Sequence, residues 1–186
     1  MNEPELKWPD YAFVPQTEFV HAIGMVSINF NLLEQSIRWV LSLVIDLPEE
    51  PFLMLFNTLD NSSRSSLLRL CDNAGKFDSK LNTSITNFVE GFNVCCKNRN
   101  ILMHAHVIGM TDDEPFYMFM SKATKRSSKE KTYQPTVADI RKIADDMHRF
   151  YTLGLELYSY IKSANDAEKK HTIAVIALPK EITSSE

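Results

Sequence analysis

The chain has 186 residues, of which 44% are hydrophobic and 24% are charged, so it can form one globular domain with a substantial core. Its net charge of −4 excludes nucleic-acid binding through overall charge, and any such binding must be local. No apolar run approaches the ~20 residues of a membrane span, and the polar arm 1–16 does not resemble a signal peptide. Three cysteines, two of them adjacent, match neither a disulfide framework nor a zinc site. We therefore expect a reduced, cytoplasmic protein without a membrane partner.

Helical periodicity dominates the first hundred residues. Apolar residues recur every three or four positions over 17–45, which predicts a first helix that ends at the prolines that follow. A second helix is expected over 50–71, and the polar run 60–63 is expected to divide it. A third helix begins near Ser79, and its apolar stripe, continued, places Arg99 at a buried position.

The pattern changes after the third helix. Two apolar stretches flank a polar turn, which predicts a β-hairpin at about 107–121. A polar, basic loop is expected over 122–135. The tail 165–186 contains an apolar run, 172–178, which is expected either to pair with the hairpin as a strand or to cover a partner.

The last helix is expected to open at Thr136 and to continue to about residue 164. Asp139, three residues after the threonine, makes a variant of the capping box. No internal repeat or second domain is apparent in 17–164. The expected fold is therefore mainly α, an up-down bundle of four to five helices with a small β-hairpin before the last long helix.

The residues with the clearest chemical potential are Arg99-Asn100-Ile101-Leu102-Met103-His104, an R-N-x-x-x-H pattern at the end of the third helix. A guanidinium binds phosphate bidentately, and an imidazole exchanges protons near neutral pH. On a regular helix Arg99 and His104 lie about 140° apart and do not share a face, whereas Asn100 and His104 do. We therefore expect one chain to hold a small molecule poorly between Arg99 and His104. Two copies related by a two-fold axis would bring two of each into one cleft.

This pattern, late in a helical bundle, resembles the HEPN superfamily (higher eukaryotes and prokaryotes nucleotide-binding). Many members are metal-independent endoribonucleases of toxin–antitoxin, phage-defence and CRISPR-associated systems. The resemblance implies a homodimer with a composite site that cleaves RNA to 2′,3′-cyclic phosphate and 5′-hydroxyl ends, with no cofactor. It also implies an antitoxin or a nucleotidyltransferase as a candidate partner.

Carried over by residue, the resemblance makes Arg99 and His104 the catalytic pair and Asn100 the adjacent polar position. The family often has an acidic residue on an earlier helix, and Glu34 is the best candidate here. His106, two residues beyond the motif, is a second candidate acid or base. In the basic loop, five cations are expected to contact RNA: Lys122, Lys125, Arg126, Lys129 and Lys131.

Each of these residues also has a purely structural interpretation. Arg99 can be the inner half of an ion pair with Glu34 that fixes helix order. The histidines can serve as ordinary residues favoured near a helix C-terminus, and the basic loop can be a solvated charge run. Cys95 and Cys96 are expected to be small buried hydrophobes, with a redox switch as the second interpretation. The remaining histidines are scattered and do not make a metal-binding set.

Three functional hypotheses therefore stand side by side. The first is the HEPN-like endoribonuclease. The second is a non-catalytic module of the same fold that binds a nucleotide or a partner. The third is a structural helical protein, which requires Arg99 to be buried, paired within its own chain and distant from any cleft.

Overall fold

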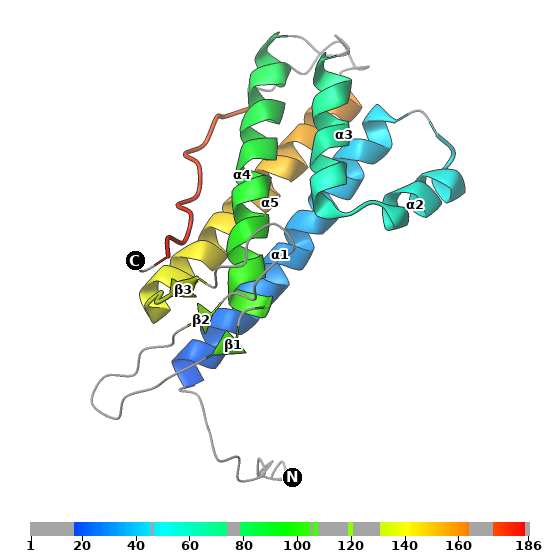
Figure 1. Cartoon of the computed structure of the whole chain (residues 1–186). Coiled ribbons are helices and arrows are strands. Elements are labelled where there is room, and N and C mark those ends of the chain that lie inside the picture. The colour runs from blue at the N-terminus through cyan, green and yellow to red at the C-terminus, as the bar shows by residue number, and fades with distance from the viewer. Residues whose placement is uncertain are drawn as a thin grey trace, which may run out of the picture.

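The chain forms a helical bundle with a small β-sheet at one end, as a computed structural model shows (Figure 1). The described residues form five helices, α1 (Thr17–Val44), α2 (Glu49–Thr58), α3 (Asn61–Asn73), α4 (Ser79–His104) and α5 (Val137–Ser163). They form three short strands, β1 (His106–Val107), β2 (Phe119–Met120) and β3 (Thr132–Tyr133). The expected mainly α bundle, with β structure before the last long helix, is confirmed. The structure describes residues 17–45, 47–73, 79–104, 106–107, 119–120, 131–163 and 173–184.

The sheet is antiparallel with the strand order β1-β2-β3. Strands β1 and β2 lie at the two ends of the expected hairpin. Strand β3 lies inside the stretch 122–135 that was expected to be loop, so that expectation is wrong for its last part. Phe119 and Tyr133 are directly opposite each other in the register, and both are buried. Burial of this cross-strand aromatic pair explains why a third strand forms here.

Helices α1 and α5 make the most extensive contact in the bundle. The side-chain amide of Asn29 donates to the carbonyl of Ala144 at 2.9 Å, and the rings of Trp39 and Tyr158 lie 6.2 Å apart. Because both contacts advance along the two helices in the same direction, α1 and α5 are parallel neighbours. The buried amide of Asn29 satisfies a polar group that would otherwise be costly in the core.

Helix α4 runs antiparallel to α5 and packs closely against it. A Cβ atom added to Gly91 would overlap the ring of Phe150, and one added to Gly154 would lie 3.0 Å from the ring of Phe88. Both phenylalanines are fully buried. Glycine is therefore needed at position 91 because the aromatic ring occupies the space of its missing side chain.

The division between α2 and α3 has a local cause. Asp60 precedes α3 and accepts a hydrogen bond from the backbone N–H of Ser63 at 2.7 Å, as an N-cap residue does. The hydrogen bonds from Ser63 lower the pKa of the Asp60 carboxyl. The expected break in the second helical segment is confirmed, and α2 projects from the side of the bundle (Figure 1).

Helix α5 begins at the expected capping arrangement. The backbone N–H of Thr136 donates to the Asp139 carboxylate at 2.9 Å, and the backbone N–H of Asp139 donates to the Thr136 hydroxyl at 3.1 Å. The Thr136 hydroxyl also donates to the same carboxylate at 2.7 Å. The reciprocal pair satisfies two N–H groups that the helix leaves without partners.

The C-terminal segment, residues 173–184, runs along the outside of α4 (Figure 1, red). It belongs to no strand, so the expectation that this region pairs with the hairpin is wrong. Instead, its isoleucines at 173, 176 and 182 pack against the hydrophobic core of its own chain. The segment therefore covers the bundle itself.

Two buried asparagines of α4 hold the C-terminal segment. Asn87 donates to the carbonyl of Ile176 at 2.9 Å and accepts from its N–H at 3.1 Å. Asn98 donates to the carbonyl of Lys180 and accepts from the N–H of Ile182, both at 2.9 Å. Each amide thus replaces the pair of hydrogen bonds that a neighbouring strand would supply.

Candidate active site

The R-N-x-x-x-H residues lie on the last turns of α4, which ends at His104. Arg99 is half-buried, whereas Asn100 and His104 are exposed. The buried stripe passes through Asn98, which is 1% exposed, and places Arg99 at its edge. The expectation that Arg99 continues the buried stripe is therefore wrong, because the neighbouring Asn98 occupies the buried position. The structural hypothesis required Arg99 to be buried, which it is not, and paired within its own chain, which it is.

Arg99 and His104 are in direct contact within one chain. The Nη1 atom of Arg99 lies 2.6 Å from Nε2 of His104 and donates to Oδ1 of Asn100 at 3.3 Å. The two side chains therefore meet, although their Cα atoms lie on different faces of the helix. The wheel angle describes the Cα positions, and the long arginine side chain spans the difference.

The contact has a defined polarity. A guanidinium carries N–H donors and no acceptor, so Nε2 of His104 must be the acceptor in this pair. The proton of the neutral imidazole is then on Nδ1. The Arg99 guanidinium also lies 5.4 Å from the ring centroid of Phe30, a cation–π contact that holds it over α1.

Glu34 has a different partner from the one expected. Its carboxylate accepts from the amide of Asn61 at 2.8 Å and from Nη1 of Arg64 at 3.3 Å. The Arg64 guanidinium lies 4.0 Å from the ring centroid of Phe56, and its Nε atom is buried without a hydrogen-bond partner. The expected ion pair between Glu34 and Arg99 is therefore replaced by one with Arg64, which ties α3 and the end of α2 to α1.

The thiol of Cys96 lies among these charges. Burial raises the pKa of Cys96 to about 12, with a further contribution in the same direction from Glu34. The guanidinium groups of Arg99 and Arg64 act in the opposite direction but are outweighed. Burial also raises the pKa of Cys95. Both thiols are therefore poor nucleophiles. Cys95 is buried as expected, whereas Cys96 is only partly buried.

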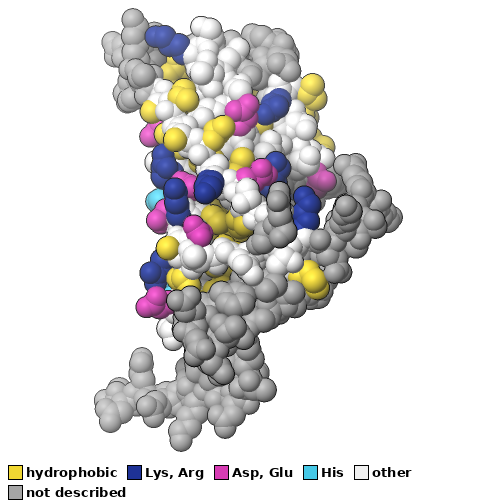
Figure 2. Space-filling view, turned by 60° about the vertical axis from the view of Figure 1, so that its left-hand side comes forward, with side chains coloured by type: hydrophobic (Ala, Val, Ile, Leu, Met, Phe, Trp, Pro, Cys, Tyr) yellow, Lys and Arg dark blue, Asp and Glu magenta, His cyan; other side chains and the backbone are white. Residues whose placement is uncertain are grey.

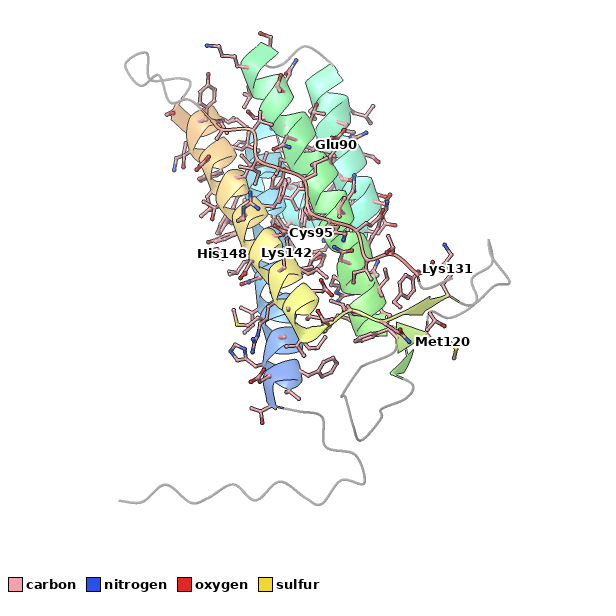
Figure 3. All side chains as sticks on the ribbon, turned by 90° about the vertical axis from the view of Figure 1, so that its left-hand side faces the viewer. Glu90, Cys95, Met120, Lys131, Lys142 and His148 are labelled. Carbon is pink, nitrogen blue, oxygen red and sulfur yellow. The ribbon has the colours of Figure 1, made fainter. Side chains whose placement is uncertain are left out.

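Five of the other expected site residues have side chains outside the described residues. His106 lies in β1, but its side chain is outside the described residues. Four of the loop cations also lie outside the described residues: Lys122, Lys125, Arg126 and Lys129. Lys131 is exposed immediately before β3, at the sheet end of the bundle (Figure 3).

The described part of the chain contains neither a metal-binding cluster nor a membrane-spanning helix. No group of three His, Cys, Asp or Glu side chains is close enough there to hold a metal ion. None of the described helices has the length and apolar character needed to cross a membrane.

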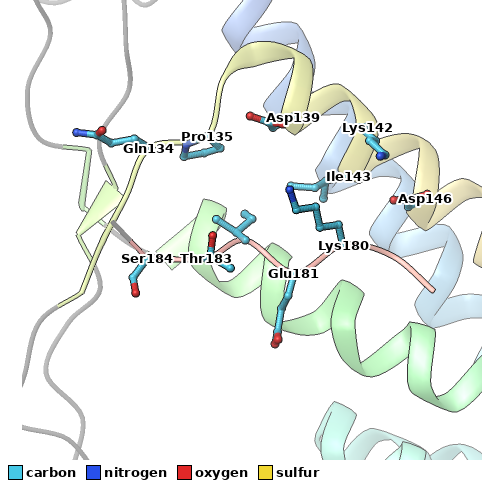
Figure 4. A pocket seen from close by; sticks show the side chains of 11 residues that line it. Gln134, Pro135, Asp139, Lys142, Ile143, Asp146, Lys180, Glu181, Thr183 and Ser184 are labelled. Carbon is cyan, nitrogen blue, oxygen red and sulfur yellow. The ribbon is translucent and has the colours of Figure 1, made fainter. Parts of the chain in front are cut away.

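A cavity of about 390 Å³ lies between the C-terminal segment and the first turns of α5 (Figure 4). Lys142 and Lys180 face it together with Asp139 and Asp146. Asp146 forms an ion pair with Arg149 at 3.0 Å. On the molecular face shown in Figure 2, side chains of both signs are interspersed. The mixed charges of this cavity select no ligand class.

Comparisons with models of protein families, with curated proteins and with solved structures found no match to this chain.

Proposed function

We propose that this chain is a metal-independent endoribonuclease of the HEPN type. The observation that carries the proposal is the 2.6 Å contact between Arg99 and His104 at the exposed end of α4, with Asn100 beside them. A phosphate-binding group and a proton-transfer group in contact at an accessible surface are the elements that RNA transesterification needs.

The proposed reaction begins with an RNA phosphate that approaches Arg99. The phosphate competes for the N–H that Arg99 donates to His104, which leaves the lone pair of Nε2 available as a base. His104 takes the proton of the ribose 2′-hydroxyl, and the 2′-oxygen forms a bond to the adjacent phosphorus. The bond from phosphorus to the 5′-oxygen breaks, and that oxygen receives a proton. Arg99 stabilises the charge on the non-bridging oxygens, and Asn100 positions the phosphate.

The proposed active form is a homodimer in which a second copy supplies the acid for the departing 5′-oxygen. One face of α1 supports this assembly. Val20 and Ile28 are 52% and 56% exposed, and a Cβ atom on Gly24, one turn from each, would meet nothing within 4 Å. Exposed apolar side chains on either side of a glycine, where a second surface can approach the helix closely, favour contact with another protein.

The test is cleavage of total RNA and of end-labelled single-stranded RNA by purified protein in EDTA. Wild-type protein is expected to produce fragments with 2′,3′-cyclic phosphate ends, and R99A and H104A are expected to lose activity by at least about 100-fold. His148→Ala, an exposed histidine on α5, is the matched control and should retain full activity. Wild-type activity in both R99A and H104A, or a requirement for an added divalent metal, contradicts the proposal.

One observation favours the non-catalytic alternative, a nucleotide- or partner-binding module. Arg99 already has His104, Asn100 and Phe30 as partners within its own chain, so its charge is stabilised without a phosphate. This alternative predicts intact RNA in the assay above and a nucleotide-dependent rise in melting temperature. An antitoxin or a nucleotidyltransferase is the partner class that it implies.

A further inference from the structure

A polar groove lies between α3 and α4 and reaches the candidate active site. It encloses about 670 Å³, and both walls carry polar side chains at helical spacing. The polar lining includes Ser62, Ser66 and Arg69 on α3, and Asn93, Lys97 and Asn100 on α4. Each set follows the i, i+4, i+7 pattern, so each wall is one face of its helix.

The groove offers the groups that recognise a sugar-phosphate backbone. Serine hydroxyls and asparagine amides can bond to both phosphate oxygens and ribose hydroxyls, and a guanidinium and an ammonium supply positive charge. Cys96 is the one lining residue without a strongly polar side chain. An apolar peptide or a lipid chain would find little complementary surface on these walls.

The two cations of the groove have partners that a phosphate can displace. Arg69 is 49% exposed and lies 3.7 Å from Glu90, and Lys97 is 61% exposed and lies 2.6 Å from Glu181. Ion pairs between exposed side chains contribute little to stability. Asp60 also lines the groove. Its carboxylate accepts a hydrogen bond from the backbone N–H of Ser63, at the N-terminus of α3, which partly offsets its negative charge.

Asn100 connects the groove to the candidate active site. It lines the groove, and its Oδ1 accepts a hydrogen bond from Arg99. On α4, Asn93, Lys97, Asn100 and His104 follow one another at intervals of three or four residues, so they share one face of the helix. A strand bound along this face would therefore pass from the groove to the exposed imidazole within the same subunit.

We propose that the groove between α3 and α4 binds the backbone of single-stranded RNA next to the phosphate that is cleaved. This inference rests on the proposed function, and it deepens it by naming where the flanking nucleotides lie. Arg69 and Lys97 contact phosphates, and the serine and asparagine side chains contact phosphates and 2′-hydroxyls. Because these contacts are to the backbone, they contribute affinity without base specificity.

The experiment compares R69A/K97A with wild-type full-length protein and with R141A/K142A. The control pair removes the same charge from α5, and Arg141 is matched to Arg69, being 52% exposed and 3.3 Å from Glu18. Cleavage of a fluorescent 12-nucleotide RNA gives kcat and KM, and anisotropy with H104A protein at several salt concentrations gives Kd. R69A/K97A should raise KM about tenfold, and in the H104A background it should raise Kd about tenfold. The slope of log Kd against log salt concentration should fall by about 1.4, because two phosphate contacts are lost. kcat should stay within about twofold, and the control should resemble wild type.

The outcomes separate this inference from the proposed function. If wild-type protein cleaves RNA while R69A/K97A has unchanged KM, Kd and salt slope, the groove proposal is wrong and the nuclease proposal stands. If wild-type protein binds the RNA without cleaving it, and R69A/K97A weakens that binding, the groove binds RNA as proposed, but the nuclease proposal and the placement beside a cleaved phosphate are wrong. If wild-type protein neither binds nor cleaves the RNA, both are wrong.

Discussion

The sharpest structural prediction concerns Asn98→Ala, because one side chain of α4 holds the C-terminal segment at this point. Asn98 is 1% exposed and makes two hydrogen bonds of 2.9 Å, to the carbonyl of Lys180 and from the N–H of Ile182. A buried backbone group left without a partner costs about 1–3 kcal/mol. The segment can avoid part of this cost by detaching and hydrating both groups. We therefore expect a loss of about 2–3 kcal/mol in the free energy of unfolding.

Urea unfolding and thermal melting measure this loss. For a chain of this size, about 2–3 kcal/mol corresponds to a fall of roughly 4–12 °C in Tm. Detachment should also speed trypsin cleavage after Lys180, which mass spectrometry identifies. Asn31→Ala, an exposed asparagine on α1, is the matched control and should change stability by less than about 0.5 kcal/mol.

A double-mutant cycle tests the stated cause. In a chain truncated before Ile173, Asn98 has lost both backbone partners, so Asn98→Ala should cost less than about 1 kcal/mol. An equal cost in the full-length and truncated chains would show that the asparagine stabilises α4 itself. Unchanged stability of the full-length variant, with trypsin cleavage as slow as in wild type, would refute the reasoning outright.

Three further predictions follow from local geometry. Gly91→Ala should destabilise the chain by about 1–3 kcal/mol because the new methyl group meets the ring of Phe150. Gly24→Ala should stabilise the monomeric chain by up to about 1 kcal/mol. An equal effect of the two substitutions on the urea midpoint of the monomer would contradict this. Asp139→Ala should lose about 0.5–1 kcal/mol at pH 7. Hydrogen bonds from the capping threonine lower the pKa of Asp139, so its contribution is present above its unfolded value of 3.8 and lost as pH falls through the lower folded value. The difference from wild type in denaturant titrations should close over that acidic range, and a constant difference would exclude this cause. Burial raises the pKa of Cys96 to about 12, so at pH 8 its thiol should react with a disulfide reagent about two to three orders of magnitude more slowly than in urea, and equal rates would count against the buried environment.

The features that the sequence predicts well are those with local causes. The helix break at residues 59–60 and the cap at Thr136 depend on side chains that bond to backbone groups three residues away. The apolar repeat of three and four residues predicts the long helices because it reports which face is buried. The candidates Arg99 and His104 come from another local pattern, the R-N-x-x-x-H spacing, and their role is still a prediction.

The features that it misses depend on distant partners or on side-chain reach. Asn87 and Asn98 bond to residues more than 80 positions away, so nothing near them indicates their burial. Glu34 selects Arg64, 30 residues along, because the break after α2 turns α3 back against α1. The contact between Arg99 and His104 depends on how far a guanidinium extends, which a helical wheel does not represent.

The side-chain amides of Asn87 and Asn98 act as two clamps on the C-terminal segment, and they relate a length along α4 to a length along that segment. The eleven residue-to-residue steps from Asn87 to Asn98 in α4 rise about 16 Å, and the five steps from Ile176 to Glu181, at the rise of an extended chain, cover about the same length. The spacing of the two contact points along the C-terminal segment therefore matches the spacing of Asn87 and Asn98 along the helix. Insertion of a single residue between the two contact points of the C-terminal segment would keep the hydrogen bonds of one asparagine and break those of the other. In any natural variant that keeps both clamps, these two spacings should change together or not at all.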